Sequence, residues 1–206
     1  MSQEEDQWRA YKERVFGTEY MIWHDGLYTG AVTSLRGADR EEALAMLRLG
    51  VSLGDAHAAE ALAAMGDAES EAAMRAQLAA ASGTARVRLA LAVHAIAPDP
   101  TLAAHLVDVL QTPAHWATRI DAAMGLRHFA GSDDERALLE AVCDPEYLVR
   151  YHACDSLLVR WKVAPSDVSG HPDIFALMCG PREGAPTAED FAHFAEAREA
   201  LLRLRS

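Results

Sequence analysis

Asparagine is absent from the 206 residues, and lysine occurs only at Lys12 and Lys162. Arginine therefore supplies nearly all of the positive charge. Because the codons for asparagine and lysine are rich in A and T, this bias is typical of a GC-rich bacterial genome. We take it as an indication of bacterial origin and not of function.

Positive charge is also scarce, since 19 Lys and Arg residues face 31 Asp and Glu residues, for a formal net charge of −12. Binding to nucleic acid or to anionic lipid depends on Lys and Arg side chains that neutralise phosphates. The excess of negative charge argues against a nucleic acid or a membrane as the partner. It favours another protein, with a basic surface.

Long apolar runs are missing, and none reaches the ~18 residues of a membrane-spanning helix. The first residues, Met-Ser-Gln-Glu-Glu-Asp, are acidic and lack the apolar core of a secretory signal. Three cysteines, Cys143, Cys154 and Cys179, form no CxxC pair and fit reduced thiols better than a disulfide framework. We expect a cytoplasmic protein.

Catalytic motifs are lacking as well: there is no glycine-rich phosphate loop, nucleophile elbow or HExxH element. His152 and Asp155 are three apart on a predicted helix, but no third group accompanies them. His152 and Cys154 are zinc-compatible ligand types, yet their spacing to the other candidates matches no compact motif. We predict that the protein is not an enzyme and holds no metal or cofactor.

A second polar pair, His24 and Asp25, stands next to Trp23 and Tyr28. Aromatic and ionisable groups together can form a pocket. The favoured interpretation is a turn at Asp25-Gly26 within an N-terminal cap.

What the chain does contain is a period of 31 residues, because Arg88, Arg119 and Arg150 occupy equivalent places in similar Ala-rich stretches. Such a period is typical of a helical repeat. A weaker fourth copy, which lacks the arginine, has its turn at Gly54-Asp55. The turns of the other three copies are Gly83-Thr84, Thr112-Pro113 and Asp144-Pro145.

The apolar pattern predicts an all-α fold. We expect a first helix over 2–16 with a capping box of Ser2 and Glu5, and one or two short helices between 19 and 36. Asp39 and Thr101 are predicted N-caps. Four hairpins are expected over 39–49 with 56–65, 69–81 with 86–97, 102–110 with 115–130, and 135–143 with 146–161. A short helix over 173–178 and a last helix after Thr187 follow, with Phe191, Phe194, Ala197, Leu201 and Leu204 as its apolar stripe.

This pattern predicts a single domain over 1–206, with an N-terminal helical cap over 1–38, repeats over 39–163 and a C-terminal cap over 164–206. The two end segments differ from the repeats, as expected if they cover the terminal apolar faces of an array.

Between residues 39 and 162 the chain resembles the HEAT-repeat family, most nearly its short bacterial branch named for the phycobilisome lyases. The best-matching stretch is Asp144-Pro145-x-x-x-Val149-Arg150-x-x-Ala153-x-x-Ser156-Leu157. The resemblance implies an α-α superhelix, or solenoid, of about four hairpins, whose second helices line a concave binding surface. It also implies that the repeat arginines bridge to turn acids or carbonyls of adjacent repeats. Asp144 is one candidate acceptor, but the turns at Gly83 and Thr112 lack an acid.

On the predicted concave face, aromatic residues are candidate anchors for a protein partner. Packing between adjacent repeats is the alternative for Trp116 and Ile120. The candidate partner-binding residues are Trp116, Ile120 and Arg127 in the third repeat, and Tyr147, Tyr151 and Asp155 in the fourth.

Composition and resemblance together favour a non-catalytic protein–protein interaction module for a basic partner. One form of it is an immunity protein that covers the basic cleft of a toxin. The alternative is a lyase-like or ligand-handling HEAT-repeat protein. A DNA glycosylase-like HEAT protein is disfavoured because it needs a basic concave surface.

Overall fold

The computed structural model describes residues 2–113, 115–180 and 184–205. Within these ranges every regular element is an α-helix or a short 3-10 helix, and no strand occurs. The predicted all-α fold is therefore confirmed. No helix in the described ranges combines the length and the apolar character that crossing a membrane requires.

The chain divides into two compact units, Met1–Asp99 (unit 1) and Pro100–Ser206 (unit 2). The division falls at the Pro98-Asp99-Pro100 segment, between the second and third predicted hairpins. The single domain expected from the sequence stays a prediction.

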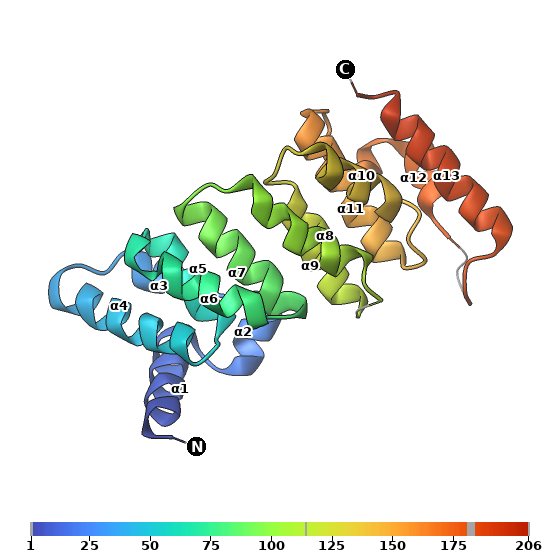
Figure 1. Cartoon of the computed structure of the whole chain (residues 1–206). Coiled ribbons are helices and arrows are strands. Elements are labelled where there is room, and N and C mark those ends of the chain that lie inside the picture. Colours follow the sequence, from blue (N-terminus) through green and yellow to red (C-terminus); the bar gives the residue numbers. More distant parts are fainter. Residues whose placement is uncertain (1, 114, 181–183, 206) are drawn as a thin grey trace. The chain divides into compact units, whose positions relative to one another are not determined.

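The α-helices of both units are labelled in Figure 1. Unit 1 contains α1 (Gln3–Phe16), α2 (Glu19–Asp25), α3 (Gly30–Thr33), α4 (Gly37–Ser52), α5 (Ala56–Met65), the 3-10 helix η1 (Ala68–Ser70), α6 (Glu71–Ala80) and α7 (Gly83–Ile96). Unit 2 contains η2 (Pro100–Leu102), α8 (Ala103–Gln111), α9 (Trp116–Leu126), α10 (Ser132–Ala141), α11 (Tyr147–Trp161), η3 (Val168–Gly170), α12 (Pro172–Met178) and α13 (Ala188–Leu202).

Each unit contains two stacked helical hairpins. In unit 1, α4 pairs with α5 and α6 with α7, while α5 also contacts α7 and α4 contacts α6. Unit 2 repeats this arrangement with α8 and α9, α10 and α11, α9 against α11, and α8 against α10. Second helices thus pack on second helices within a unit, as in helical repeat proteins. A superhelix that continues through all four hairpins stays a prediction.

Small residues on the second helices make the close packing possible. Ala90, Ala122 and Ala153 are completely buried on α7, α9 and α11. A methyl group at these points allows neighbouring helices to approach, and longer side chains such as Leu62 and Leu157 fill the space between them at interior density.

The starts of the helices show which of the predicted N-caps were correct. Ser2 and Glu5 form the predicted capping box, with the Glu5 amide donating to Ser2 Oγ at 3.1 Å. Asp39 and Thr101 are not N-caps, so these two predictions were wrong. α4 begins two residues before Asp39, at Gly37, and its N-cap is Arg36. Thr101 lies inside the 3-10 turn η2 that leads into α8.

Within unit 2, the C-terminal segment after α11 folds back on that helix. α12 packs on α13, and both α12 and η3 contact α11. Phe194, Ala197 and Leu201 of the predicted α13 stripe are buried. Phe191 departs from that prediction, because 40% of its surface is exposed at the start of the helix.

Candidate functional site

The three repeat arginines have three different environments. Arg150 on α11 is only 1% exposed. Its Nε donates to the Met178 carbonyl at 3.0 Å, and its Nη1 donates to the Asp144 and Pro145 carbonyls at 2.7 and 3.0 Å. The guanidinium also lies 3.8 Å from the ring centroid of Phe194. Arg150 therefore ties α11 to its own entry turn and to the C-terminal segment.

Arg119 and Arg88 pair with carboxylates instead. On α9, Arg119 donates to the carboxylate of Asp144, in the turn before α11. On α7, Arg88 donates through Nη1 to Glu60 Oε2 on α5 at 2.5 Å. The acceptor thus belongs to the following hairpin for Arg119 and to the preceding hairpin for Arg88, so the contacts form no regular ladder.

An exposed aromatic row marks the second helices of unit 2. Trp116 at the start of α9 is 40% exposed, and Tyr147 at the start of α11 is 37% exposed. They occupy equivalent positions, one period apart, on helices that contact each other. Ile120 lies one turn after Trp116 and is partly exposed. The exposed Met124 extends the same stripe by another turn, and Leu148 is exposed beside Tyr147. Neither Met124 nor Leu148 was among the residues predicted for this face from the sequence.

Tyr151 and Asp155, also predicted for this face, are engaged within unit 2. The Tyr151 hydroxyl donates to Asp167 Oδ2 at 2.8 Å, and this bond raises the pKa of Tyr151 to about 12. Asp155 Oδ1 accepts from the Val168 amide at 2.8 Å. The Tyr151 ring packs edge-on against Phe175 of α12. Both residues hold the C-terminal segment on α11. Their side chains are therefore less accessible to a partner than the sequence suggested.

Arg127, the last of the predicted partner-binding residues, ends α9. Its Nη2 donates to Ser156 Oγ on α11 at 3.3 Å. Its Nε is buried and has no hydrogen-bond partner among the described residues. Arg127 therefore contributes chiefly to the contact between α9 and α11.

The two polar pairs that the sequence raised as chemical candidates are not brought into a site. His24 Nδ1 lies 2.7 Å from Asp25 Oδ1, but both side chains are exposed and stand at the end of the short helix α2. Cys154 is fully buried, which raises the pKa of its thiol, whereas His152 is partly exposed. In the described ranges, no three His, Cys, Asp or Glu side chains are placed to hold a metal ion.

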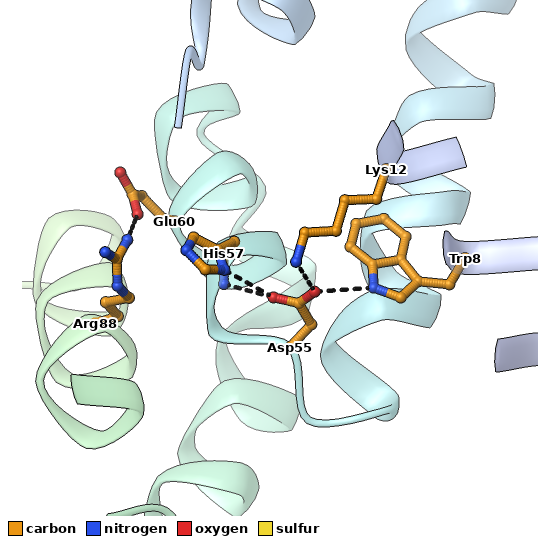
Figure 2. Close-up of polar contacts among 6 residues, drawn as sticks. All are labelled: Trp8, Lys12, Asp55, His57, Glu60 and Arg88. Atoms are coloured by element: carbon orange, nitrogen blue, oxygen red, sulfur yellow. Dashed lines mark hydrogen bonds and ion pairs between the residues drawn. The ribbon is translucent and has the colours of Figure 1, made fainter. Parts of the chain in front are cut away.

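Unit 1 contains a polar cluster that the sequence argument did not identify (Figure 2). Asp55 is the N-cap of α5, and its Oδ1 accepts from the His57 amide at 2.9 Å. Its Oδ2 accepts from Trp8 Nε1 at 3.0 Å and from Lys12 Nζ at 2.7 Å. Two residues one turn apart on α1 thus meet a helix start more than forty residues later in the chain.

Electrostatics favour the ionised form of Asp55. Burial alone raises the pKa of this carboxyl, but the hydrogen bonds from His57 and Lys12 and the charge of Lys12 outweigh it and hold the pKa well below its usual range. The Asp55 carboxylate is therefore charged throughout the neutral range. It fixes both α1 and the start of α5.

An open groove borders this cluster. One part, of about 450 Å³, is lined by Trp8, Lys12, Leu53, His57, Arg88 and neighbouring residues. An adjoining part of about 390 Å³ shares Lys12, His57, Thr84 and Arg88 and extends to Glu19, Ile22 and Gly26. These two parts are called the unit 1 groove below. All of its walls belong to α1, α2, α5, α7 and their connections.

Comparisons of the chain with protein-family models, with curated proteins and with solved structures found no match.

Proposed function

We propose that the protein is a non-catalytic interaction module that binds another protein, with a basic surface, on the second-helix face of unit 2. The observation that carries this proposal is the pair Trp116 and Tyr147, exposed at equivalent positions of two contacting helices. Met124 extends the stripe of Trp116, and Trp, Tyr and Met are all enriched at protein interfaces.

Charge supports the choice of a basic partner. The formal charge of −12 attracts cationic surfaces and speeds their association. Tyr147 follows the exposed Glu146 in the chain, so this helix start offers an aromatic ring and a carboxylate on consecutive residues. An Arg or Lys side chain of a partner can use both at once, through a cation–π contact and an ion pair.

The stacked hairpins within each unit are compatible with the proposed HEAT-like repeat, in which second helices supply the binding face. In this proposal the protein acts in the cytoplasm and has no chemical step. Neutralisation of a toxin, by covering its basic active-site cleft, is one form that such binding would take.

The test is capture of partners from a lysate of the cells that naturally make the protein. The bait is the full chain, compared with the double variant Trp116→Ala/Tyr147→Ala. Phe191→Ala is a matched control, since Phe191 is as exposed as Trp116 but lies on α13. We expect a basic protein that the wild type and the control retain and the double variant loses.

The captured protein is then purified and its affinity measured by calorimetry. The double variant should bind at least roughly a hundredfold more weakly, as expected when two anchors are removed. Equal binding by wild type and double variant, or an acidic partner, would contradict the proposal.

A further inference from the structure

Three side chains of the unit 1 groove carry hydrogen-bond donors that no described residue accepts from. Among the described residues, Lys12 Nζ and Arg88 each contact a single carboxylate, Asp55 and Glu60, although they carry three and five N–H groups respectively. His57 uses Nδ1 toward Asp55 Oδ1 at 3.3 Å and no described residue pairs with its Nε2. These three side chains come from three different helices, α1, α5 and α7, and line both parts of the groove.

The carboxylate of Asp55, at the centre of the cluster, already has its hydrogen bonds. Asp55 accepts from Trp8, Lys12 and the His57 amide, so both of its oxygens are occupied. Its tight hold on Lys12 keeps that ammonium in place at the groove wall. α7 also begins at the groove, where Thr84 and Ala85 line it, and a helix start favours negative charge. The groove therefore has unused hydrogen-bond donors, which suit a ligand that accepts hydrogen bonds.

Three acids line the groove. Asp55 is paired with Lys12, and the other two restrict what that acceptor can be. Glu5 and Glu19 lie along the groove, and like charges repel an anion. This repulsion doubles for a dianionic phosphate relative to a singly charged carboxylate. Leu53, Ile22 and Ala56 add an apolar wall, which suits a carboxylate with apolar groups beside it. The groove is also open to solvent, which suits a segment of polypeptide chain better than an enclosed metabolite.

We propose that the unit 1 groove binds a carboxylate of a polypeptide segment with apolar neighbours, held by Lys12, His57 and Arg88. The carboxylate comes either from a Glu or Asp side chain or from a chain terminus, and the experiment separates the two sources. This site is distinct from the second-helix face of unit 2, and its test does not depend on that face.

The experiment is an NMR titration of the full chain, labelled with nitrogen-15, with three acetylated pentapeptides. The first, Leu-Ala-Glu-Leu-Ala amide, carries a side-chain carboxylate. The second, Leu-Ala-Ala-Leu-Ala with a free C-terminus, carries a terminal carboxylate. The third, Leu-Ala-Gln-Leu-Ala amide, is neutral, and inorganic phosphate serves as a fourth probe. We expect saturable shifts of the His57, Thr84 and Ala85 amides with one or both of the charged peptides.

Variants locate the contact. Arg88→Gln should lower the affinity for the charged peptide by about tenfold, as expected for the loss of one charge-assisted hydrogen bond. Arg88→Lys, which keeps the charge, should weaken it less. The matched control is Arg36→Gln. Arg36 is in the same unit, and among the described residues it bonds only to the Thr33 and Leu35 carbonyls of its own turn.

An unchanged amide spectrum away from the groove verifies that each variant is folded. The proposal is overturned if the neutral peptide binds as tightly as the charged ones, if phosphate binds more tightly than either peptide, or if Arg88→Gln and Arg36→Gln behave alike. Absence of shifts at millimolar peptide would also overturn it.

Discussion

Arg88 in unit 1 and Arg150 in unit 2 stand at the same place of the repeat and have opposite surroundings. The Arg88 side chain is 30% exposed, bonds to one carboxylate and lines an open groove. Arg150 is buried, bonds to three backbone carbonyls and lies on the Phe194 ring. The difference arises from what packs next to each helix: the C-terminal segment covers Arg150, while Arg88 keeps access to solvent.

A repeat position therefore does not determine a role. A guanidinium that satisfies buried carbonyls is part of the fold, because its removal leaves polar groups without partners. A partly exposed guanidinium with unused donors contributes little to stability and is available to a ligand. The comparison predicts a graded set of effects.

The largest effect is expected from Arg150→Met. Methionine keeps much of the apolar length but removes the donors to Met178, Asp144 and Pro145. Relief from burying the guanidinium offsets part of this loss, so we expect the free energy of unfolding to fall by about 3 kcal/mol. Urea unfolding followed by circular dichroism measures it. Arg150→Lys, which restores a charge but not three directed donors, should recover only part of the loss.

Asp55→Asn is expected to lower the free energy of unfolding by about 2 kcal/mol at neutral pH, because the ion pair with Lys12 is lost. Since the pKa of folded Asp55 is depressed, its contribution is present above the unfolded-state pKa of about 3.9 and fades as the pH falls through the folded value. The difference in the free energy of unfolding between wild type and variant should thus be constant above about pH 5 and become smaller in acid. A gap that widens in acid would contradict the assignment.

A smaller effect is expected from Tyr151→Phe, which removes the hydroxyl bond to Asp167 and keeps the ring against Phe175. The loss should be about 0.5–1 kcal/mol. Hydrogen exchange of the Val168 amide, bonded to Asp155, should quicken as the segment loosens. If exchange there is unchanged, Tyr151 does not hold the segment, and its role as a free partner-binding residue regains support.

The smallest effect on stability is expected from Arg88→Gln. An ion pair with this exposure contributes about 0–1 kcal/mol, so the midpoint of urea unfolding should barely move. A loss comparable to that of Arg150→Met would remove the distinction between the two positions.

Most of the helices could be predicted from local sequence signals. The helix over 56–65, after a turn at Gly54-Asp55, was predicted with the observed bounds, because the turn and the apolar period are local signals. The Asp55 cap and the left-handed Gly66 that bound it in the structure are local features of the same kind. Asp39 was misassigned because an acid in the first turn and an acid at the N-cap look alike in sequence. Trp116 and Tyr147 could be found from the period, which places them on one face.

The remaining features depend on contacts between distant segments. Nothing near Asp55 in the sequence indicates that Trp8 and Lys12 will reach it, since the contact exists only once α1 packs on α4. The contacts of Tyr151 and Asp155 with residues 167–175 are likewise tertiary and have no signal in the local sequence. The role of these two residues in partner binding stays a prediction. Periodicity identifies faces, but it does not show which of them the same chain will cover.

The most direct test of the divergence between equivalent arginines is a paired measurement on Arg88→Gln and Arg150→Met, recording both the free energy of unfolding and the affinity for the carboxylate peptides. We expect a crossover: Arg88→Gln stays stable and loses about tenfold in peptide affinity, while Arg150→Met is destabilised by about 3 kcal/mol and, while folded, binds peptide normally. Parallel losses in both variants would contradict it.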